Sequence, residues 1–197
     1  KNAGELLLRR IGSQNARGRE LMQLARILDM DQVPERIEAY DISHFQDAQP
    51  SGSQIVFTAE GFQKQAYRRY AIQDETLPDD TARMAEVLSR RLLALKQQEG
   101  TDEPEIAALW PDLILLDGGL GQLNAVLEVA CELQMEGIQF CAIAKGPQRN
   151  AGRERLFLPG RDAPIILPHD APVLLLLQKI RDEAHRFAIG FHRVRRK

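Results

Sequence analysis

The apolar residues of this chain follow two kinds of spacing, which predict its helices and its strands. Apolar positions recur at helical spacing over 2–30, from 78 to 95, from 120 to 130 and from 170 to about 191. Shorter apolar or alternating runs predict strands at 36–42, 55–57, 67–72, 113–116, 140–144, 156–158 and 165–167. Residues 59–61 and 159–160 have the composition of tight turns, so each predicts a hairpin.

The order of these segments predicts the class of fold. Residues 113–116 form a continuous apolar run, which is typical of a parallel strand buried on both faces. The helix and strand that follow complete a βαβ unit, whereas the earlier strands form an antiparallel hairpin. The pattern favours an α/β fold with a ribonuclease-H-like mixed sheet flanked by helices over a doubly wound nucleotide-binding fold. We expect a helical lead-in or linker at 1–34 and one folded domain at 35–197.

Composition narrows the class of protein. The 197 residues are 44% hydrophobic, which suits a folded domain with its own core and excludes a disordered chain. Cys131 and Cys141 cannot form a disulfide framework, so we expect a reducing compartment. No apolar run reaches the roughly 18 residues of a membrane span. Because the chain begins with Lys1 rather than Met, we expect it to be part of a longer protein.

Charge is distributed unevenly behind a net value of −2. Residues 1–26 carry six basic and two acidic side chains, and residues 179–197 carry seven basic and two acidic ones. The residues between them therefore carry a net charge of −11. A polyanion such as DNA could bind this chain only if metal ions or a few placed basic residues offset those carboxylates.

Asp41 and Asp117 each stand at the end of a predicted strand. Sites in mixed α/β sheets gather at the carboxyl ends of parallel strands, and neighbouring strands lie roughly 4.8 Å apart. If the two strands are neighbours, the carboxylates converge and repel each other, and a divalent cation such as Mg²⁺ removes the repulsion. The alternative is that each Asp caps a turn, which is common for Asp at strand ends.

Two further features near these residues could carry chemistry. The Gly-rich loop 118–121 joins a strand to a helix but fits neither dinucleotide-binding nor P-loop spacing, so we interpret its glycines as room for a sharp turn beside Asp117. His185 lies on the flank of the last predicted helix. Its imidazole could transfer a proton or bind a metal, and the alternative is a bond to a neighbouring carboxylate such as Asp182. His44, close to Asp41 in the chain, is a second candidate.

Five segments of the chain form a set: YDISH at 40–44, YRRY at 67–70, PDLILLDGGLGQL at 111–123, FLPGR at 157–161 and LQKIRDEAHRFA at 177–188. Together they resemble the UvrC family, a component of the bacterial UvrABC nucleotide excision repair complex. The order and spacing agree from about residue 35 to 197, and residues 1–34 resemble the helical segment that precedes this domain. The family's GIY-YIG nuclease module and helix-hairpin-helix module have no counterpart in these 197 residues.

The resemblance implies an RNase H-like endonuclease domain that incises DNA 5′ to a lesion with a divalent metal, Mg²⁺ or Mn²⁺. It places the family's catalytic and metal-binding Asp-Asp-His set on Asp41, Asp117 and His185. The implied partners are damaged double-stranded DNA and UvrB, with UvrA acting earlier in the pathway and no membrane involved. A cytoplasmic location in bacteria and a link to the SOS response to DNA damage are implied in the same way.

Basic residues near these positions are candidates for DNA phosphate contacts: Lys145, Arg161, Arg181 and Arg186. The alternative for each is a solvated surface side chain. Arg68 and Arg69 alternate along a predicted strand, so only one of them can face a given partner. Two other functional classes stay open: a non-catalytic DNA-binding or scaffold module with an RNase H-like fold, and a small-molecule binder that uses the loop 118–121.

Overall fold

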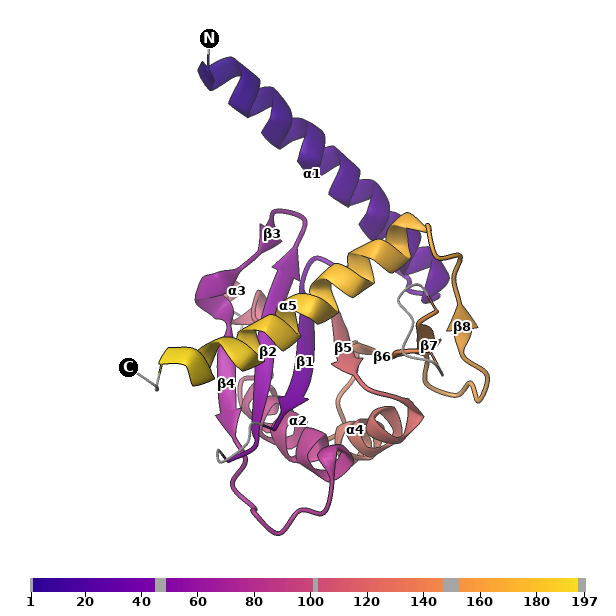
Figure 1. Cartoon of the computed structure of the whole chain (residues 1–197). Coiled ribbons are helices and arrows are strands. Elements are labelled where there is room, and N and C mark those ends of the chain that lie inside the picture. The colour runs from indigo at the N-terminus through magenta and orange to yellow at the C-terminus, as the bar shows by residue number, and fades with distance from the viewer. Residues whose placement is uncertain (1, 45–48, 101–102, 147–152, 195–197) are drawn as a thin grey trace.

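The computed structural model describes residues 2–44, 49–100, 103–146 and 153–194 of the chain. Its strands are β1 (Ile37–Ser43), β2 (Ser51–Thr58), β3 (Gly61–Phe62), β4 (Arg68–Ala71), β5 (Leu113–Asp117), β6 (Gln139–Ala144), β7 (Arg155–Phe157) and β8 (Ile165–Ile166) (Figure 1). Its helices are α1 (Asn2–Ile27), α2 (Asp80–Lys96), α3 (Pro104–Ala107), α4 (Leu120–Glu132) and α5 (Pro172–Val194), with a 3₁₀ turn η1 (Lys64–Ala66). Every strand and long helix expected from the sequence is present.

The eight strands of the described residues form one mixed sheet in the order β3-β2-β1-β5-β6-β7-β8, with β4 as a further partner of β2. The central strands β1, β5 and β6 are parallel. Antiparallel pairs flank them, β2 on β1 and β7 on β6. A parallel centre with antiparallel flanks is the RNase H-like mixed sheet predicted from the order of the segments.

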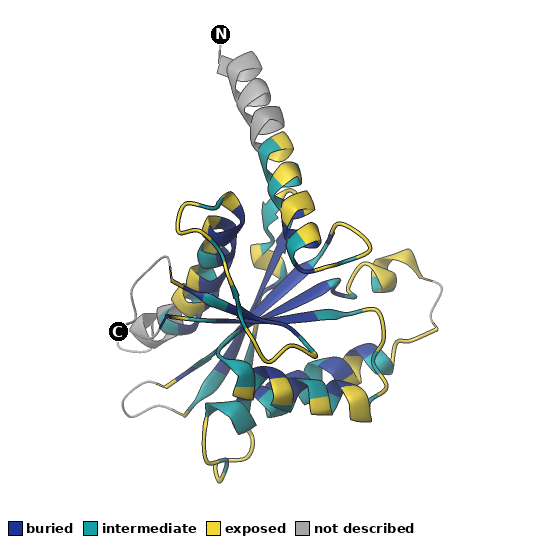
Figure 2. Cartoon of the chain, turned by 90° about the vertical axis from the view of Figure 1, so that its right-hand side faces the viewer, coloured by how far each residue is buried: buried dark blue, intermediate teal, exposed yellow. Residues whose placement is uncertain are grey.

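Helices cover both faces of this sheet (Figures 1 and 2). On one face, α5 and the end of α1 pack against residues such as Ala39 and Leu115. On the other face, α2 and α4 pack against residues such as Tyr40 and Leu116. Successive strand residues point to opposite faces, so the apolar run 113–116 supplies both cores and is fully buried.

The start of α2 shows how local sequence sets an element of this fold. The Asp79 carboxylate accepts a hydrogen bond from the Ala82 amide at 2.9 Å, which caps the helix. A Cβ atom at Gly52 would lie 2.7 Å from Val87 of α2, so glycine lets this helix approach β2 closely. The helix therefore presses against the sheet beside the end of β1.

The first helix is a single element, although Gly12 and Gly18 lower its intrinsic propensity. Its last turns bury Leu21, Leu24 and Leu28 in the same core as α5, while its first turns extend beyond the sheet (Figure 1). The division of the chain at residue 34 stays a prediction. None of the described helices combines the length and apolar character that crossing a bilayer requires.

The structure extends β2 well beyond the predicted segment 55–57. It begins at Ser51 and includes Ser53 and Gln54, which are polar and buried. The Gln54 side chain accepts a hydrogen bond from the Tyr70 hydroxyl, and Ser53 donates to a carbonyl of α5. Alternation of apolar residues cannot reveal a strand whose inward positions are satisfied by hydrogen bonds, which explains the shorter prediction.

Candidate metal centre

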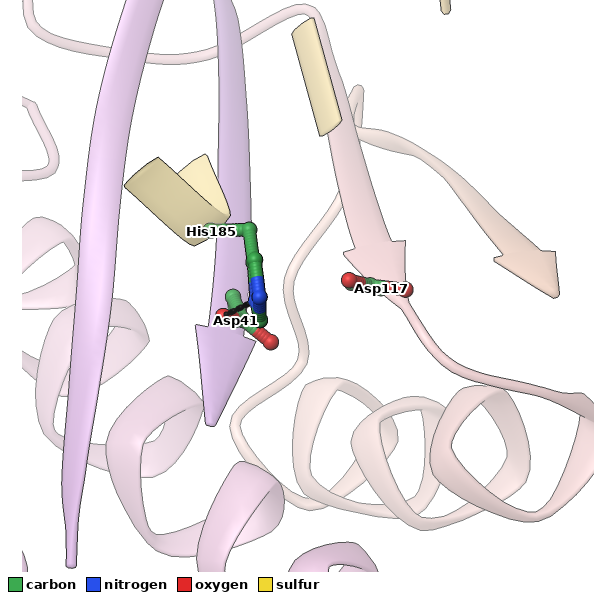
Figure 3. Close-up of side chains that lie close together, drawn as sticks. All are labelled: Asp41, Asp117 and His185. Atoms are coloured by element: carbon green, nitrogen blue, oxygen red, sulfur yellow. Dashed lines mark hydrogen bonds and ion pairs between the residues drawn. The ribbon is translucent and has the colours of Figure 1, made fainter. Parts of the chain in front are cut away.

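Two carboxylates meet at the carboxyl ends of neighbouring parallel strands. Tyr40 on β1 is paired in register with Leu116 on β5, so the next residues along, Asp41 and Asp117, follow that pair side by side. Asp117 is the last residue of β5. The two strands are neighbours, which is the condition under which the sequence predicted that the carboxylates converge, and Figure 3 shows both carboxylates at the same edge of the sheet.

His185 reaches the same place (Figure 3) from α5, which crosses the sheet over β1 and β2 (Figure 1). Its Nδ1 lies 3.0 Å from Oδ2 of Asp41. One ligand atom from each of Asp41, Asp117 and His185 lies within 4.8 Å of the other two. The imidazole therefore does bond to a carboxylate, but its partner is Asp41 of the sheet, whereas Asp182 of its own helix pairs with Arg181.

Burial disfavours the charged form of both carboxyl groups, and at Asp117 the Asp41 charge adds to this effect. Burial, followed by the nearby Asp41 charge, raises the pKa of Asp117 to about 6. Burial also raises the pKa of Asp41, against the opposing effect of its hydrogen bond with His185. A cation between the two carboxylates would restore the charged form of both, because it removes the repulsion and replaces lost hydration.

The donor set suits a hard divalent cation. Two carboxylate oxygens at the edge of a sheet leave room for water ligands, which Mg²⁺ retains and Mn²⁺ accepts. An imidazole nitrogen is a further ligand that Mn²⁺ accepts. Among the described residues, Asp41, Asp117 and His185 are the group of three whose ligand atoms converge in this way. They could hold Mg²⁺ or Mn²⁺.

A third carboxylate, which the sequence pattern did not indicate, lies near this centre. Asp80 in the first turn of α2 is close enough for its charge to raise the pKa of Asp41, although burial of Asp41 is the larger cause. Its own carboxylate pairs with His44 and, at 3.2 Å, with Arg83. The separation of 39 residues from Asp41 leaves no local pattern that could have indicated this proximity.

The glycine loop after β5 is a turn in which the first two amides are already bonded. The Gly118 amide donates to the Ile143 carbonyl at 3.1 Å, and the Gly119 amide donates to the Gln122 side chain at 2.9 Å. A Cβ atom at Gly118 would lie 2.9 Å from that glutamine side chain. These contacts agree with the steric interpretation of the loop, because a phosphate cradle needs its amides free.

The four basic candidates for phosphate contact lie in different surroundings. Lys145 is exposed directly after β6, and its charge acts on both Asp41 and Asp117. Arg161 is exposed in the turn between β7 and β8. Arg186 is exposed on α5, where Glu183 accepts two hydrogen bonds from its guanidinium. DNA contact by these residues stays a prediction.

Arg181 differs from the other three because it is only 7% exposed. Its guanidinium donates to the buried Glu154 at 3.2 Å and to Asp182 at 2.9 Å. The same charge acts on Asp117, where it partly offsets the effects of burial and of Asp41. Its surroundings thus favour a structural and electrostatic role for Arg181.

The sheet order and this edge of two carboxylates and an imidazole define an RNase H-like α/β domain. A family model described as the UvrC RNAse H endonuclease domain matches residues 25–189, and the chain belongs to this family. The description of the family indicates an endonuclease domain.

The individual relatives share one name with each other, UvrABC system protein C. UvrABC system protein C of Hyphomonas neptunium is 47% identical over 100% of this chain and 32% of that protein. The proteins of that name from Paramagnetospirillum magneticum and Nitrobacter winogradskyi are 49% and 48% identical, over 99% and 100% of this chain and 31% and 30% of their own. The chain thus spans about a third of the length of these curated relatives.

A solved structure of Ciona intestinalis endonuclease V in complex with a 24mer DNA containing an inosine followed by a ribo-adenosine is also similar. It is 10% identical with a TM-score of 0.43, over 93% of this chain and 99% of that chain. A likeness of this size carries no weight in the assignment.

Proposed function

We propose that the chain is the catalytic domain of a divalent-metal-dependent endodeoxyribonuclease that hydrolyses a phosphodiester 5′ to a lesion in nucleotide excision repair. The observation that carries the proposal is the meeting of Asp41, Asp117 and His185, whose ligand atoms lie within 4.8 Å of one another. The family described as an endonuclease domain supplies the reaction class.

Asp41 and Asp117 are the residues that would hold Mg²⁺ or Mn²⁺. Both carboxylates end neighbouring strands of a rigid sheet, so their spacing is set by backbone pairing rather than by a mobile loop. When bound, such an ion screens a phosphodiester and stabilises the negative charge that develops during its hydrolysis. The raised pKa of Asp117 means that cation binding and loss of its proton are coupled.

His185 is the proposed group for proton transfer or for a further metal bond. When the imidazole is neutral, an Nδ1–H that donates to the Asp41 carboxylate leaves Nε2 free to accept a proton. The His185 side chain is 55% exposed, whereas that of Asp41 is 9% exposed. Asp41 therefore orients an imidazole that stays accessible to a substrate.

DNA is the proposed substrate, with UvrB as the partner and UvrA acting earlier. Lys145 is the basic residue best placed for a phosphate contact, because it is exposed and its charge acts on both carboxylates of the centre. Arg161 and Arg186 would extend the contact along the surface. We propose a bacterial cytoplasmic setting and a link to the SOS response on the basis of the family alone.

A nicking assay on a duplex with one defined lesion tests this function, with UvrA and UvrB present and Mg²⁺, Mn²⁺ or EDTA added. We expect a cut 5′ to the lesion that needs the metal and is lost in Asp41→Asn and Asp117→Asn, while both variants still bind the damaged complex. Retained cutting in these variants, or cutting in EDTA, would refute the metal centre. Binding by the wild type without any cut would instead support the scaffold alternative.

A further inference from the structure

Three residues form one line across the sheet beneath α5. Asp41 on β1 is paired in register with Ser53 on β2, and Ser53 is paired with Arg69 on β4. Directly opposite residues in antiparallel strands point to the same face. That face carries α5, which crosses it in Figure 1. Asp41, Ser53 and Arg69 therefore lie next to one another on the face that α5 covers.

Ser53 contacts the backbone of Asp41 and of Ala184, the residue that precedes His185 on α5. Its hydroxyl lies 3.1 Å from the carbonyl oxygen of Ala184, the residue before His185. The same hydroxyl lies 3.4 Å from the carbonyl oxygen of Asp41. Ser53 is 1% exposed, so bulk water does not compete for this contact. A single side chain thus sets the distance between α5 and β1 next to the metal centre.

Arg69 holds α5 on the other side of His185. Its guanidinium donates to the carbonyl oxygens of Phe187 and, at 3.3 Å, Ala188. Its Cζ atom also lies 4.3 Å from the centre of the Phe187 ring, a cation–π distance. The ring of Tyr67 packs edge-on against the same phenyl ring, with 5.0 Å between centres. Residues of this part of the sheet therefore contact both the backbone and a side chain of α5.

These hydrogen bonds constrain the helix in a way that its apolar contacts do not. The carbonyls of Ala184, Phe187 and Ala188 lie inside α5, where each oxygen has a second lone pair beyond the one used in the helix. Apolar packing is non-directional, whereas a hydrogen bond requires both a distance and an angle. Contacts before and after His185 therefore fix the rotation and the position of this turn.

We propose that Ser53 and Arg69 are positioning residues, which hold α5 so that the His185 imidazole faces the Asp41 carboxylate. The kinetic consequence rests on the proposed endonuclease function, and the structural consequence does not. A misplacement of about 1 Å at a catalytic group costs up to about 100-fold in rate. We therefore expect Ser53→Ala and Arg69→Ala each to lower kcat by about 10-fold to 100-fold with little change in KM.

The first test needs no activity. Nitrogen-15 spectra of the imidazoles in the metal-free chain, recorded where His185 is neutral, report which ring nitrogen carries its proton; His185→Ala assigns the signal. The bond to Asp41 predicts the Nδ1–H tautomer in the wild type. Ser53→Ala and Arg69→Ala are expected to shift it toward the Nε2–H form that free imidazole side chains prefer in water. An Nε2–H wild type, or variants that keep the Nδ1–H form, would overturn the inference.

The second test is kinetic and includes a matched control. Arg68 precedes Arg69 on β4, is exposed, and donates to the carbonyls of Gln65 and Tyr67 rather than to α5. Arg68→Ala is expected to keep the wild-type kcat and tautomer. Arg69→Lys, which retains the charge but not the two-pronged donor, is expected to recover part of the rate. Should Arg69→Ala unfold, Ser53→Ala and Arg69→Lys carry the test.

A double-mutant cycle separates positioning from general damage to the fold. If Ser53 acts through His185, Ser53→Ala adds no further loss of kcat in a His185→Ala background. An additive loss, or a wild-type kcat in both Ser53→Ala and Arg69→Ala, would refute the positioning role. A wild type that makes no cut would refute the proposed function, and the tautomer measurement would still decide the positioning role.

Discussion

His185 and Asp41 stand 144 residues apart in the chain, and their side chains form a hydrogen bond of 3.0 Å between Nδ1 and Oδ2. The carboxylate is buried in the sheet and the imidazole is more than half exposed. The buried partner is thus held by the backbone, and the exposed partner is the one that a phosphodiester can reach. The hydrogen bond thus connects a buried carboxylate of β1 to an exposed imidazole of α5.

Removing the imidazole is expected to lower the nicking rate far more than the stability. Loss of a proton-transfer group typically costs about 100-fold to 10,000-fold in rate, so His185→Ala is expected to fall in that range. The side chain is largely exposed, and the midpoint of thermal unfolding should change by no more than a few degrees. His169→Ala, at another exposed histidine, is the control and should cut at the wild-type rate. Equal rates in the two variants would contradict the assignment.

Asp117→Asn is expected to stabilise the metal-free domain at neutral pH. Burial and the Asp41 charge raise the pKa of Asp117 from 3.8 to about 6, so the folded state binds this proton more tightly than the unfolded state. The contribution of Asp117 to stability is therefore fully present below about pH 4 and is lost as the pH rises through 6. The full difference corresponds to about 3 kcal/mol, and solvent at the half-buried carboxylate reduces it to about 1–2 kcal/mol.

Thermal unfolding in EDTA, measured from pH 4 to pH 7.5, checks this expectation. Wild type and Asp117→Asn should converge at the acid end and separate near neutrality, with the variant more stable. Added Mn²⁺ should raise the unfolding temperature of the wild type only, because the amide removes a charged ligand. A variant that is less stable in EDTA at neutral pH would show that Asp117 carries no such electrostatic cost.

Lys145→Ala is expected to weaken DNA binding, whereas Arg181→Ala is expected to lower the stability of the domain. Lys145 is exposed beside the two carboxylates, so its loss should weaken DNA binding and reduce the salt dependence of the binding constant by roughly one ion. Arg181 is buried against Glu154, and its loss should cost about 3 kcal/mol of stability. Anisotropy titrations across salt concentrations and urea unfolding measure the two effects. If the DNA-binding constant of Lys145→Ala depends on salt concentration as that of the wild type does, Lys145 does not contact the DNA.

Glu38 anchors a buried ionic network on the α2 face of the sheet. Its fully buried carboxylate accepts hydrogen bonds from Arg36 at 2.9 Å, from Arg91 at 2.6 Å and from the Tyr40 hydroxyl at 2.6 Å. Glu38→Gln would leave two guanidiniums facing a neutral amide, and we expect a loss of about 3–5 kcal/mol in urea unfolding. The matched change Glu99→Gln removes only an exposed pair and should cost less than about 1 kcal/mol.

The two cysteines are expected to differ sharply toward thiol reagents. Burial raises the pKa of the Cys141 thiol to about 12, so it stays protonated and inaccessible in the folded domain, whereas Cys131 is exposed. At pH 8 a disulfide reagent should titrate one thiol in the native chain and two in urea. Rapid labelling of Cys141 in the native state would show that β6 opens readily.

The local pattern of residues determined most of the framework of this site. The continuous apolar run 113–116 identified a central strand, and Asp117 at its end followed directly. The helical spacing of apolar residues in α2 and α5 was equally local. Such features can be predicted from the sequence because strand and helix periodicities depend on residues only a few positions apart. They predicted a mixed sheet with Asp41 and Asp117 at strand ends, whereas the pairing of those two strands came from the structure.

Other features depended on the tertiary structure. The sequence pattern left open whether His185 bonds to Asp182 of its own helix, and the path of α5 across the sheet turns it toward Asp41 instead. The same path buries Arg181 and brings Ser53 and Arg69 under the helix. These contacts join residues more than 100 positions apart. They depend on how a whole helix packs on a whole sheet, which no spacing along the chain encodes.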